Sequence, residues 1–248
     1  MNNQRLRGRI KSKSINSIIT IIITMKCEHC GYEWEPRKPE PVSCPRCKRR
    51  FDYPKDAIDD DPLREARTKE RGFERTVYVL SLLTPELEEK DIGCVIVGGS
   101  AVEFYTRNWY ATGDIDLAID RAKRAEVLKV FKDFGFKSEG RMWVREDLGL
   151  YLEIPGDIGD IDTNRVTKVN TDAGHAYIIG LEDIILDRLN AAKHWDSASD
   201  REQAIRIIAL YHDEMDWSYL KRKAKQDKVD DVLDQVKGAA KDARSSLE

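Results

Sequence analysis

The 248-residue sequence has no apolar stretch of the about 20 residues that a membrane-spanning helix needs. It also lacks a Gly-x4-Gly-Lys-Ser/Thr phosphate loop and a Ser-His-Asp arrangement, which argues against a P-loop enzyme and a triad hydrolase. The aspartates within 157–162 resemble a calcium loop, but the glutamate that would close it is absent. With 35% charged and 41% apolar residues, the chain has material for a solvated surface and a packed core. We expect a soluble, cytoplasmic protein that makes no membrane contact.

The formal net charge is −3, and it is unevenly distributed along the chain. Residues 1–24 contain five basic residues and no acidic residue. The chain from Met25 onward therefore has 37 of the 42 basic residues against all 45 acidic ones, a net charge of −8. An acidic body argues against a protein that coats nucleic acid by charge alone. The overall charge does not argue against a contact between a local basic patch and nucleic acid.

The first 24 residues differ from the rest, because a basic start leads into a run of isoleucine, threonine and serine. A signal peptide is one interpretation, but the small-residue cleavage site is missing and cysteine pairs follow at once. The other interpretation is that Met25 is the natural start and residues 1–24 are an extension of doubtful origin. We favour the second interpretation and assign this segment no function.

The number of cysteines is five, so they cannot all form disulfides with one another. Cys27, Cys30, Cys44 and Cys47 form two C-x2-C pairs separated by 13 residues, a spacing typical of zinc sites. Four thiolates would complete a tetrahedral shell, so the predicted Zn²⁺ is structural. The module, residues 25–54, resembles a zinc ribbon, and its role would be contact with nucleic acid or protein. We expect Cys94 to be a small buried residue instead.

After residue 72 the apolar pattern predicts alternating helices and strands. Apolar residues recur at helical spacing from Phe73 to Leu83, and Pro85 is expected to end or interrupt that helix. The following elements are expected in chain order: a strand at 94–97, a helix to 105, a strand at 114–119, a helix at 121–134, a hairpin of 141–145 with 149–154, a strand near 175–179, and helices to the end.

A Gly98-Gly99-Ser100 turn joins the first of these strands to a helix. Such a turn exposes backbone N–H groups at a helix start, where a phosphate binds well, and Ser100 would cap the helix or contact a phosphate oxygen. Asp114 and Asp116 point to the same side of the next strand, and two adjacent carboxylates favour a cation such as Mg²⁺ between them. Each feature alone is more often structural; their combination favours a site.

These motifs, with Glu153 on a later strand, resemble the DNA polymerase beta-type nucleotidyltransferase superfamily, including its antitoxin-like and uncharacterised members. The resemblance spans residues 73–210. It implies that Asp114 and Asp116 bind two Mg²⁺ ions, that Glu153 is the third catalytic carboxylate, and that the glycine turn holds the triphosphate. Arg188 and Lys193 are further candidates for contact with phosphate, although both are also ordinary cations on a helix.

The sequence also departs from that superfamily. Many members have an arginine shortly before the two aspartates, where this chain has residues 110–113, Tyr-Ala-Thr-Gly. The third acid is Glu153, where aspartate is commoner. The resemblance therefore implies the fold more directly than it implies retained catalysis.

The sequence thus predicts an α+β protein with a mixed sheet flanked by helices, a zinc ribbon and a helical C-terminal region. The expected organisation is an extension at 1–24, the ribbon at 25–54, a linker at 55–71, a nucleotidyltransferase-type core at 72–180 and helices at 181–248. The implied function is transfer of a nucleoside monophosphate from an NTP to a hydroxyl of RNA or protein. The alternative is a non-catalytic module that binds nucleic acid or a protein partner. A distance below about 6 Å from Glu153 to the two aspartates would favour the enzyme.

Overall fold

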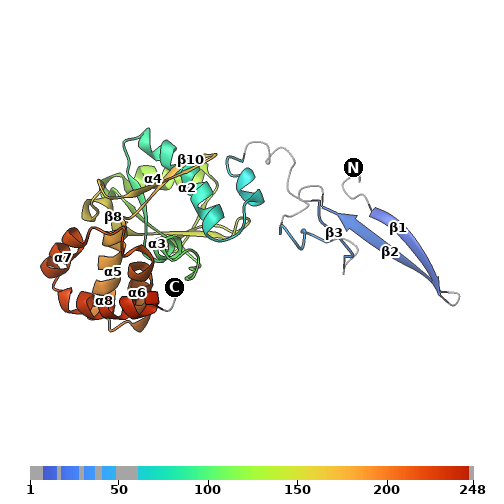
Figure 1. Cartoon of the computed structure of the whole chain (residues 1–248). Coiled ribbons are helices and arrows are strands. Elements are labelled where there is room, and N and C mark those ends of the chain that lie inside the picture. The colour runs from blue at the N-terminus through green and yellow to red at the C-terminus, as the bar shows by residue number, and fades with distance from the viewer. Residues whose placement is uncertain (1–7, 16–17, 28–30, 37–40, 49–60, 246–248) are drawn as a thin grey trace. The chain divides into compact units, whose positions relative to one another are not determined.

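The computed structural model describes residues 8–15, 18–27, 31–36, 41–48 and 61–245 (Figure 1). The chain divides into two compact units, Met1–Arg64 and Glu65–Glu248. The predicted linker at 55–71 thus contains the division, and residues 49–60 lie outside the described residues. Within the described ranges, no helix has both the length and the apolar character needed to cross a bilayer.

The first unit contains a three-stranded antiparallel sheet in the order β1-β2-β3. Strands β1 (Gly8–Ile15) and β2 (Ile18–Lys26) form a hairpin, and β3 (Glu33–Trp34) pairs with the end of β2. Strand β2 therefore runs across residue 24, where we expected the extension to end. The same strand leads directly into Cys27.

The second unit is built on a seven-stranded mixed sheet with the order β6-β7-β8-β5-β4-β10-β9. Two pairs of neighbours are parallel, β4 with β10 and β5 with β8, and the others are antiparallel. The strands are β4 (Cys94–Val97), β5 (Ile115–Ile119), β6 (Lys137–Glu139), β7 (Met142–Arg145), β8 (Leu150–Asp157), β9 (Thr167–Thr171) and β10 (Gly174–Ile178).

Helices pack on this sheet and continue into a helical C-terminal region. Helix α2 packs on β10 and β9, α3 packs on β4 and β5, and Figure 1 shows α5 to α8 gathered together in orange and red. The helices are α2 (Phe73–Glu88), α3 (Gly98–Tyr105), α4 (Arg124–Asp133), α5 (Leu181–His194), α6 (Ala198–Tyr211), α7 (Trp217–Gln226) and α8 (Asp230–Ser245), with short 3-10 turns η1 (Glu65–Thr68), η2 (Arg121–Lys123) and η3 (Ile158–Asp160). The predicted α+β class, mixed sheet and helical C-terminal region are confirmed.

The central strands form the core because the apolar side chains on one face of the sheet are almost completely buried. Ile96 on β4, Leu117 and Ile119 on β5, and Leu152 on β8 are each at most 1% exposed. Cys94 is also buried, as expected, and burial raises the pKa of its thiol to about 12. This rigid centre holds the strand ends on which the polar candidate residues lie.

Two proline positions differ from the prediction. Pro85 neither ends nor visibly divides α2, which continues to Glu88. A proline at this position leaves the carbonyl of Ser81 without its usual helical donor. Gly174 of β10 packs against that carbonyl so closely that a Cβ there would lie 2.4 Å from the Ser81 oxygen. Strand β8 likewise continues through Pro155 to Asp157, beyond the expected end at residue 154.

Candidate active site and cysteine cluster

The three predicted carboxylates meet at the middle of the sheet, where Asp116 lies on β5, Glu153 on β8, and Asp114 immediately before β5. Asp116 on β5 pairs in register with Glu153 on the parallel strand β8. Each of Asp114, Asp116 and Glu153 offers a carboxylate oxygen within 4.8 Å of those of the other two. This is below the 6 Å at which we separated the two hypotheses, so the three groups are close enough to share a cation.

A bulge in β8 lies next to this cluster. Asp116 pairs with Glu153, but Ala118, two residues later, pairs with Gly156, so β8 accommodates one extra residue. Pro155 lies in this interval, and its missing N–H costs no ladder hydrogen bond at a bulge. A Cβ at Gly156 would approach the Ala118 Cβ to 3.0 Å. The bulge thus lets β8 stay beside β5 while the strand passes the cluster.

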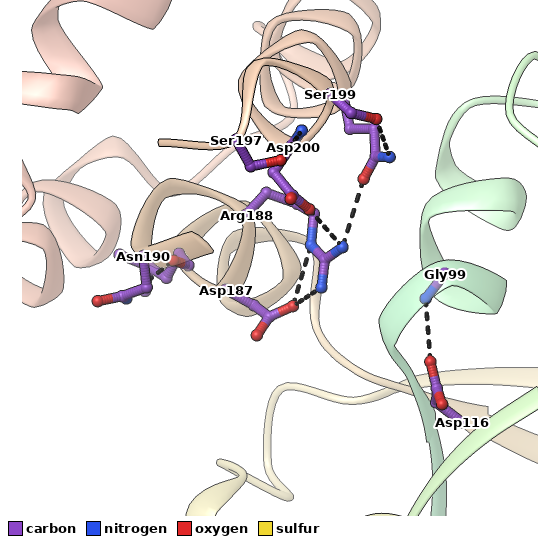
Figure 2. A network of polar contacts seen from close by, with 10 residues as sticks. Gly99, Asp116, Asp187, Arg188, Asn190, Ser197, Ser199 and Asp200 are labelled. Carbon is purple, nitrogen blue, oxygen red and sulfur yellow. Dashed lines mark hydrogen bonds and ion pairs between the residues drawn. The ribbon is translucent and has the colours of Figure 1, made fainter. Parts of the chain in front are cut away.

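The glycine turn lies directly beside Asp116. Gly98 begins α3 with a φ of +56°, a left-handed conformation that side chains disfavour. A Cβ on Gly98 would lie 2.1 Å from Oδ2 of Asp116. The next N–H, of Gly99, donates to the same Oδ2 at 3.4 Å (Figure 2). The turn therefore approaches the carboxylate as closely as only glycine permits.

Ser100 and Thr112 each donate a hydrogen bond to Asp114. The Ser100 hydroxyl is buried, makes no helix cap, and donates to the carbonyl of Asp114 at 3.1 Å. The Thr112 hydroxyl donates to Oδ1 of Asp114 at 2.8 Å. Sequence reasoning did not assign Thr112, although its place two residues before Asp114 is typical of a side chain that orients a neighbour. Both hydroxyls thus orient the chain at Asp114.

The electrostatics of the cluster favour a bound cation. Burial raises the pKa of Asp116, and the charges of Asp114 and Glu153 raise it further, against the Gly99 N–H and Arg188. Glu153 lies 3.3 Å from the guanidinium of Arg141, which is itself exposed. Carboxylate oxygens are the ligands that Mg²⁺ prefers, and a cation would relieve their repulsion. The donor set therefore fits Mg²⁺.

A cavity of about 780 Å³ extends from Asp116 and Glu153. Asp116, Glu153 and Gly98 line it on the sheet side, and residues of η3, the loop after it, α5 and α7 line the remainder. Its lining contains eight acidic side chains and three basic ones, which are Arg188, Arg222 and Lys223. The cavity is large enough for a nucleotide-sized ligand.

Arg188 lines the cavity, but carboxylates hold its guanidinium (Figure 2). It contacts Asp187 beside it on α5 and donates to Asp200 of α6 at 2.7 Å. Both charges raise the pKa of Arg188 although its burial acts in the opposite direction. Arg188 therefore acts first as a link between α5 and α6.

Lys193 does not line the cavity. Its ammonium donates to the Lys228 carbonyl and to Asp231, at 2.6 Å, where α8 begins. The geometry does not support the prediction that Lys193 contacts phosphate. Asn190, one helical turn earlier on α5, lines the cavity. Lys193 lies beyond the cavity along the helix axis, and its ammonium contacts the start of α8 instead.

The cysteines of the first unit cluster as predicted. The sulfur atoms of Cys27, Cys44 and Cys47 lie within 4.8 Å of one another, and Cys27 and Cys44 are buried. Cys30 lies outside the described residues. The Sγ atoms of Cys27 and Cys47 are 3.8 Å apart. Tetrahedral zinc with Zn–S bonds of about 2.3 Å places its sulfurs at about this separation, so the cluster fits Zn²⁺.

The first cysteine of each pair is followed, four residues later, by the same hydrogen bond and backbone conformation. The N–H of Gly31 donates to the Cys27 carbonyl, and the N–H of Lys48 donates to the Cys44 carbonyl, both at 2.9 Å. Both residues, four positions after a cysteine, have a positive φ, of 71° and 61°. The shared hydrogen bond and backbone conformation after Cys27 and Cys44 are what two C-x2-C pairs directed at one metal centre would have.

No protein-family model and no curated protein matches the chain. A solved structure of an antigenic nucleotidyltransferase-like protein from Paracoccidioides brasiliensis matches with a TM-score of 0.43 and 19% identity, over 65% of this chain and 91% of that one. The chain is structurally similar to nucleotidyltransferases. ANT(2'')-Ia, solved with adenylyl-2''-tobramycin, has a TM-score of 0.41 and 15% identity over 66% of this chain and 97% of its own. The structure of lincosamide antibiotic adenylyltransferase LnuA, lincomycin-bound, matches with a TM-score of 0.38 and 17% identity, over 51% of this chain and 92% of its own.

At these identities the similarity to nucleotidyltransferases concerns the fold.

Proposed function

We propose that this protein is a Mg²⁺-dependent nucleotidyltransferase that moves a nucleoside monophosphate from an NTP to a hydroxyl group. The observation that carries the proposal is the meeting of Asp114, Asp116 and Glu153 within 4.8 Å, beside a glycine turn that opens a helix. Structural carboxylates are normally paired with cationic side chains or spread over a surface. Three that converge within 4.8 Å, two of them lining a nucleotide-sized cavity, suit a metal-assisted phosphoryl transfer.

Each residue has a role in this reaction. Asp114 and Asp116 would hold Mg²⁺, and Glu153 would be a further ligand or accept the proton of the attacking hydroxyl. Bound Mg²⁺ would supply positive charge to the attacking and leaving oxygens. The hydroxyl oxygen forms a bond to the α-phosphorus while the bond from that phosphorus to the bridging oxygen breaks, and pyrophosphate leaves. The N–H groups of the Gly98-Gly99 turn would orient phosphate oxygens.

Ser100 takes a positioning role in this proposal. Its hydroxyl is buried and donates to the Asp114 carbonyl, so it orients the turn relative to the carboxylates and makes no direct contact with phosphate. Thr112 acts in the same way on the Asp114 carboxylate. Arg188 and Lys193 are omitted from the proposed nucleotide site because each is held by carboxylates of the helical region.

The acceptor is proposed to be a hydroxyl of a macromolecule, RNA or protein. The lining of the cavity favours protein, because eight acidic side chains against three basic ones repel a polyanionic backbone. The zinc ribbon of the first unit is proposed as a structural module whose metal stabilises a fold too small for a core of its own.

The test is transfer of label from each of the four α-labelled NTPs with Mg²⁺, with total RNA and cell protein offered as acceptors. Wild type, Asp114→Asn and Asp116→Asn are compared side by side. We expect label on one acceptor class from wild type alone. Equal labelling by wild type and variants would contradict the proposal. No labelling, together with no binding of any NTP, would favour the non-catalytic module.

A further inference from the structure

A bound triphosphate needs cations that the two predicted candidates do not provide. It carries about four negative charges, and charge-assisted hydrogen bonds from Arg and Lys are the usual way to neutralise such groups. Arg188 is paired with Asp187 and Asp200, and Lys193 lies outside the cavity. The two other basic residues that line the cavity are Arg222 and Lys223.

These two residues belong to one face of α7. Tyr219, Arg222, Lys223 and Gln226 all line the cavity, and their spacing of three and four residues places them on one side of the helix. Lys221 and Lys225 are exposed and do not line it. Within the part of the chain that the structure describes, no ion pair occupies the charged groups of Arg222 or Lys223; the Arg222 guanidinium lies 5.3 Å from the Tyr219 ring centre.

Helix α7 is fixed to α5, so this face has a defined position. The Tyr219 hydroxyl donates to Asp183 of α5 at 2.6 Å, and the Asp216 N–H before α7 donates to Glu182 at 2.7 Å. Arg165 pairs with Glu182 at 2.8 Å and lies 3.9 Å from the Tyr219 ring centre. These contacts hold the start of α7 against the helix that forms the neighbouring cavity wall.

We propose that Arg222 and Lys223 bind the β- and γ-phosphates of the NTP, across the cavity from the carboxylates of β5 and β8. This inference rests on the proposed function. It makes the triphosphate site bipartite, because the metal-binding residues come from the sheet and the cations come from the helical region. The α-phosphate then lies on the carboxylate side, where the transfer takes place, and the leaving pyrophosphate lies on the α7 side.

The experiment measures binding of each of the four NTPs and the corresponding NMPs with Mg²⁺ by calorimetry. It compares wild type, Arg222→Gln/Lys223→Gln and the matched variant Lys221→Gln/Lys225→Gln, which removes the same charge from the other side of α7. We expect the first variant to weaken NTP binding at least tenfold and NMP binding less than twofold. The matched variant should bind both as wild type does. The charge-preserving exchange Arg222→Lys/Lys223→Arg should recover most of the NTP affinity.

If wild type transfers label, the proposed function stands, and two results would then overturn the inference. In the first, the Arg222→Gln/Lys223→Gln variant keeps its affinity for NTPs. In the second, that variant loses affinity for NTPs and NMPs equally. If wild type neither binds an NTP nor transfers label, the proposed function fails and this inference fails with it.

Discussion

Asp116 and Glu153 are 37 positions apart in the sequence and lie opposite each other in register on two parallel strands. No local motif joins them, and the connection passes through η2, α4 and the β6–β7 pair. Parallel strands need such a crossover, so the cluster exists only when the sheet is fully assembled. The closeness of these two acids is therefore a property of the assembled sheet and not of a local motif.

Asp116→Asn is expected to reduce transfer at least about 100-fold, because it removes a charged metal ligand from the cluster. The pKa of Asp116 is raised by burial and by Asp114, so its ionised form is less stable in the folded protein than in the unfolded chain. Asparagine removes that cost, and the melting temperature should stay the same or rise slightly. Label transfer and thermal melting check both points. Asp133→Asn, an exposed carboxylate on α4, is the control.

Full transfer activity in Asp116→Asn would contradict the assigned role. A loss of activity that accompanies a large drop in melting temperature would instead assign Asp116 to the fold.

Gly98→Ala is expected to damage the same site through the backbone. Alanine at a φ of +56° costs about 1–2 kcal/mol, and its Cβ would displace the Asp116 carboxylate, 2.1 Å away. Activity should fall at least about tenfold. Gly113→Ala is the matched control, because nothing lies within 4 Å of a Cβ at Gly113. If both variants keep wild-type kinetics, the close approach of the turn to Asp116 has no catalytic importance.

The central part of the fold was predictable because its signals are local. The apolar run at 94–97, the glycine turn and the alternation at 114–119 each specify one element, and all three occur as expected. In the seven-stranded sheet the strands that were missed are β6 and β9, which lie at its two edges. Edge strands are short and polar, so their sequences, KSE and TKVNT, lack the apolar pattern of a strand.

The site was predictable only in part, because some of its features are local in the sequence and others depend on tertiary packing. Asp116 lies on β5 and Asp114 immediately before it, and their common direction was expected from the two-residue period of a strand. The cavity and the environments of Arg188 and Lys193 depend on how α5 packs against α6, α7 and α8. Helical spacing identifies a cation on a surface, but tertiary packing decides whether a carboxylate already holds it.

The free energy of unfolding of the second unit should depend on pH through the ionisation of Asp147. This carboxylate accepts hydrogen bonds from Arg145, at 2.9 and 3.1 Å, and from Arg67, at 2.5 Å. Burial alone would raise its pKa, but the two guanidinium groups lower it below the usual value. A lowered pKa in the folded state stabilises the protein above the unfolded pKa of about 4, and this contribution is lost as the pH falls below that value.

Asp147→Asn should therefore be less stable than wild type at neutral pH, and the difference should shrink as the pH falls from about 5 to 3. Urea unfolding at a series of pH values measures it, with Asp133→Asn as the exposed control whose curve should follow wild type. A difference in unfolding free energy that stays constant with pH would show that the ion pairs with Asp147 contribute nothing through its charge.

The cysteine cluster should hold one zinc ion and depend on it for folding. Cys44 is fully buried beside Cys27 and Cys47, and a structural zinc site contributes about 10–16 kcal/mol to a small module. Cys44→Ser is expected to lose zinc, measured by elemental analysis, and to lose the calorimetric transition of the first unit. The transition of the second unit should remain, because its buried core consists of its own strands and helices.

The matched variant Cys94→Ala removes a buried thiol from β4 and should keep one equivalent of zinc. A Cys44→Ser protein that retains one equivalent, or a wild type purified with none, would contradict the zinc assignment and leave the carboxylate site unaffected.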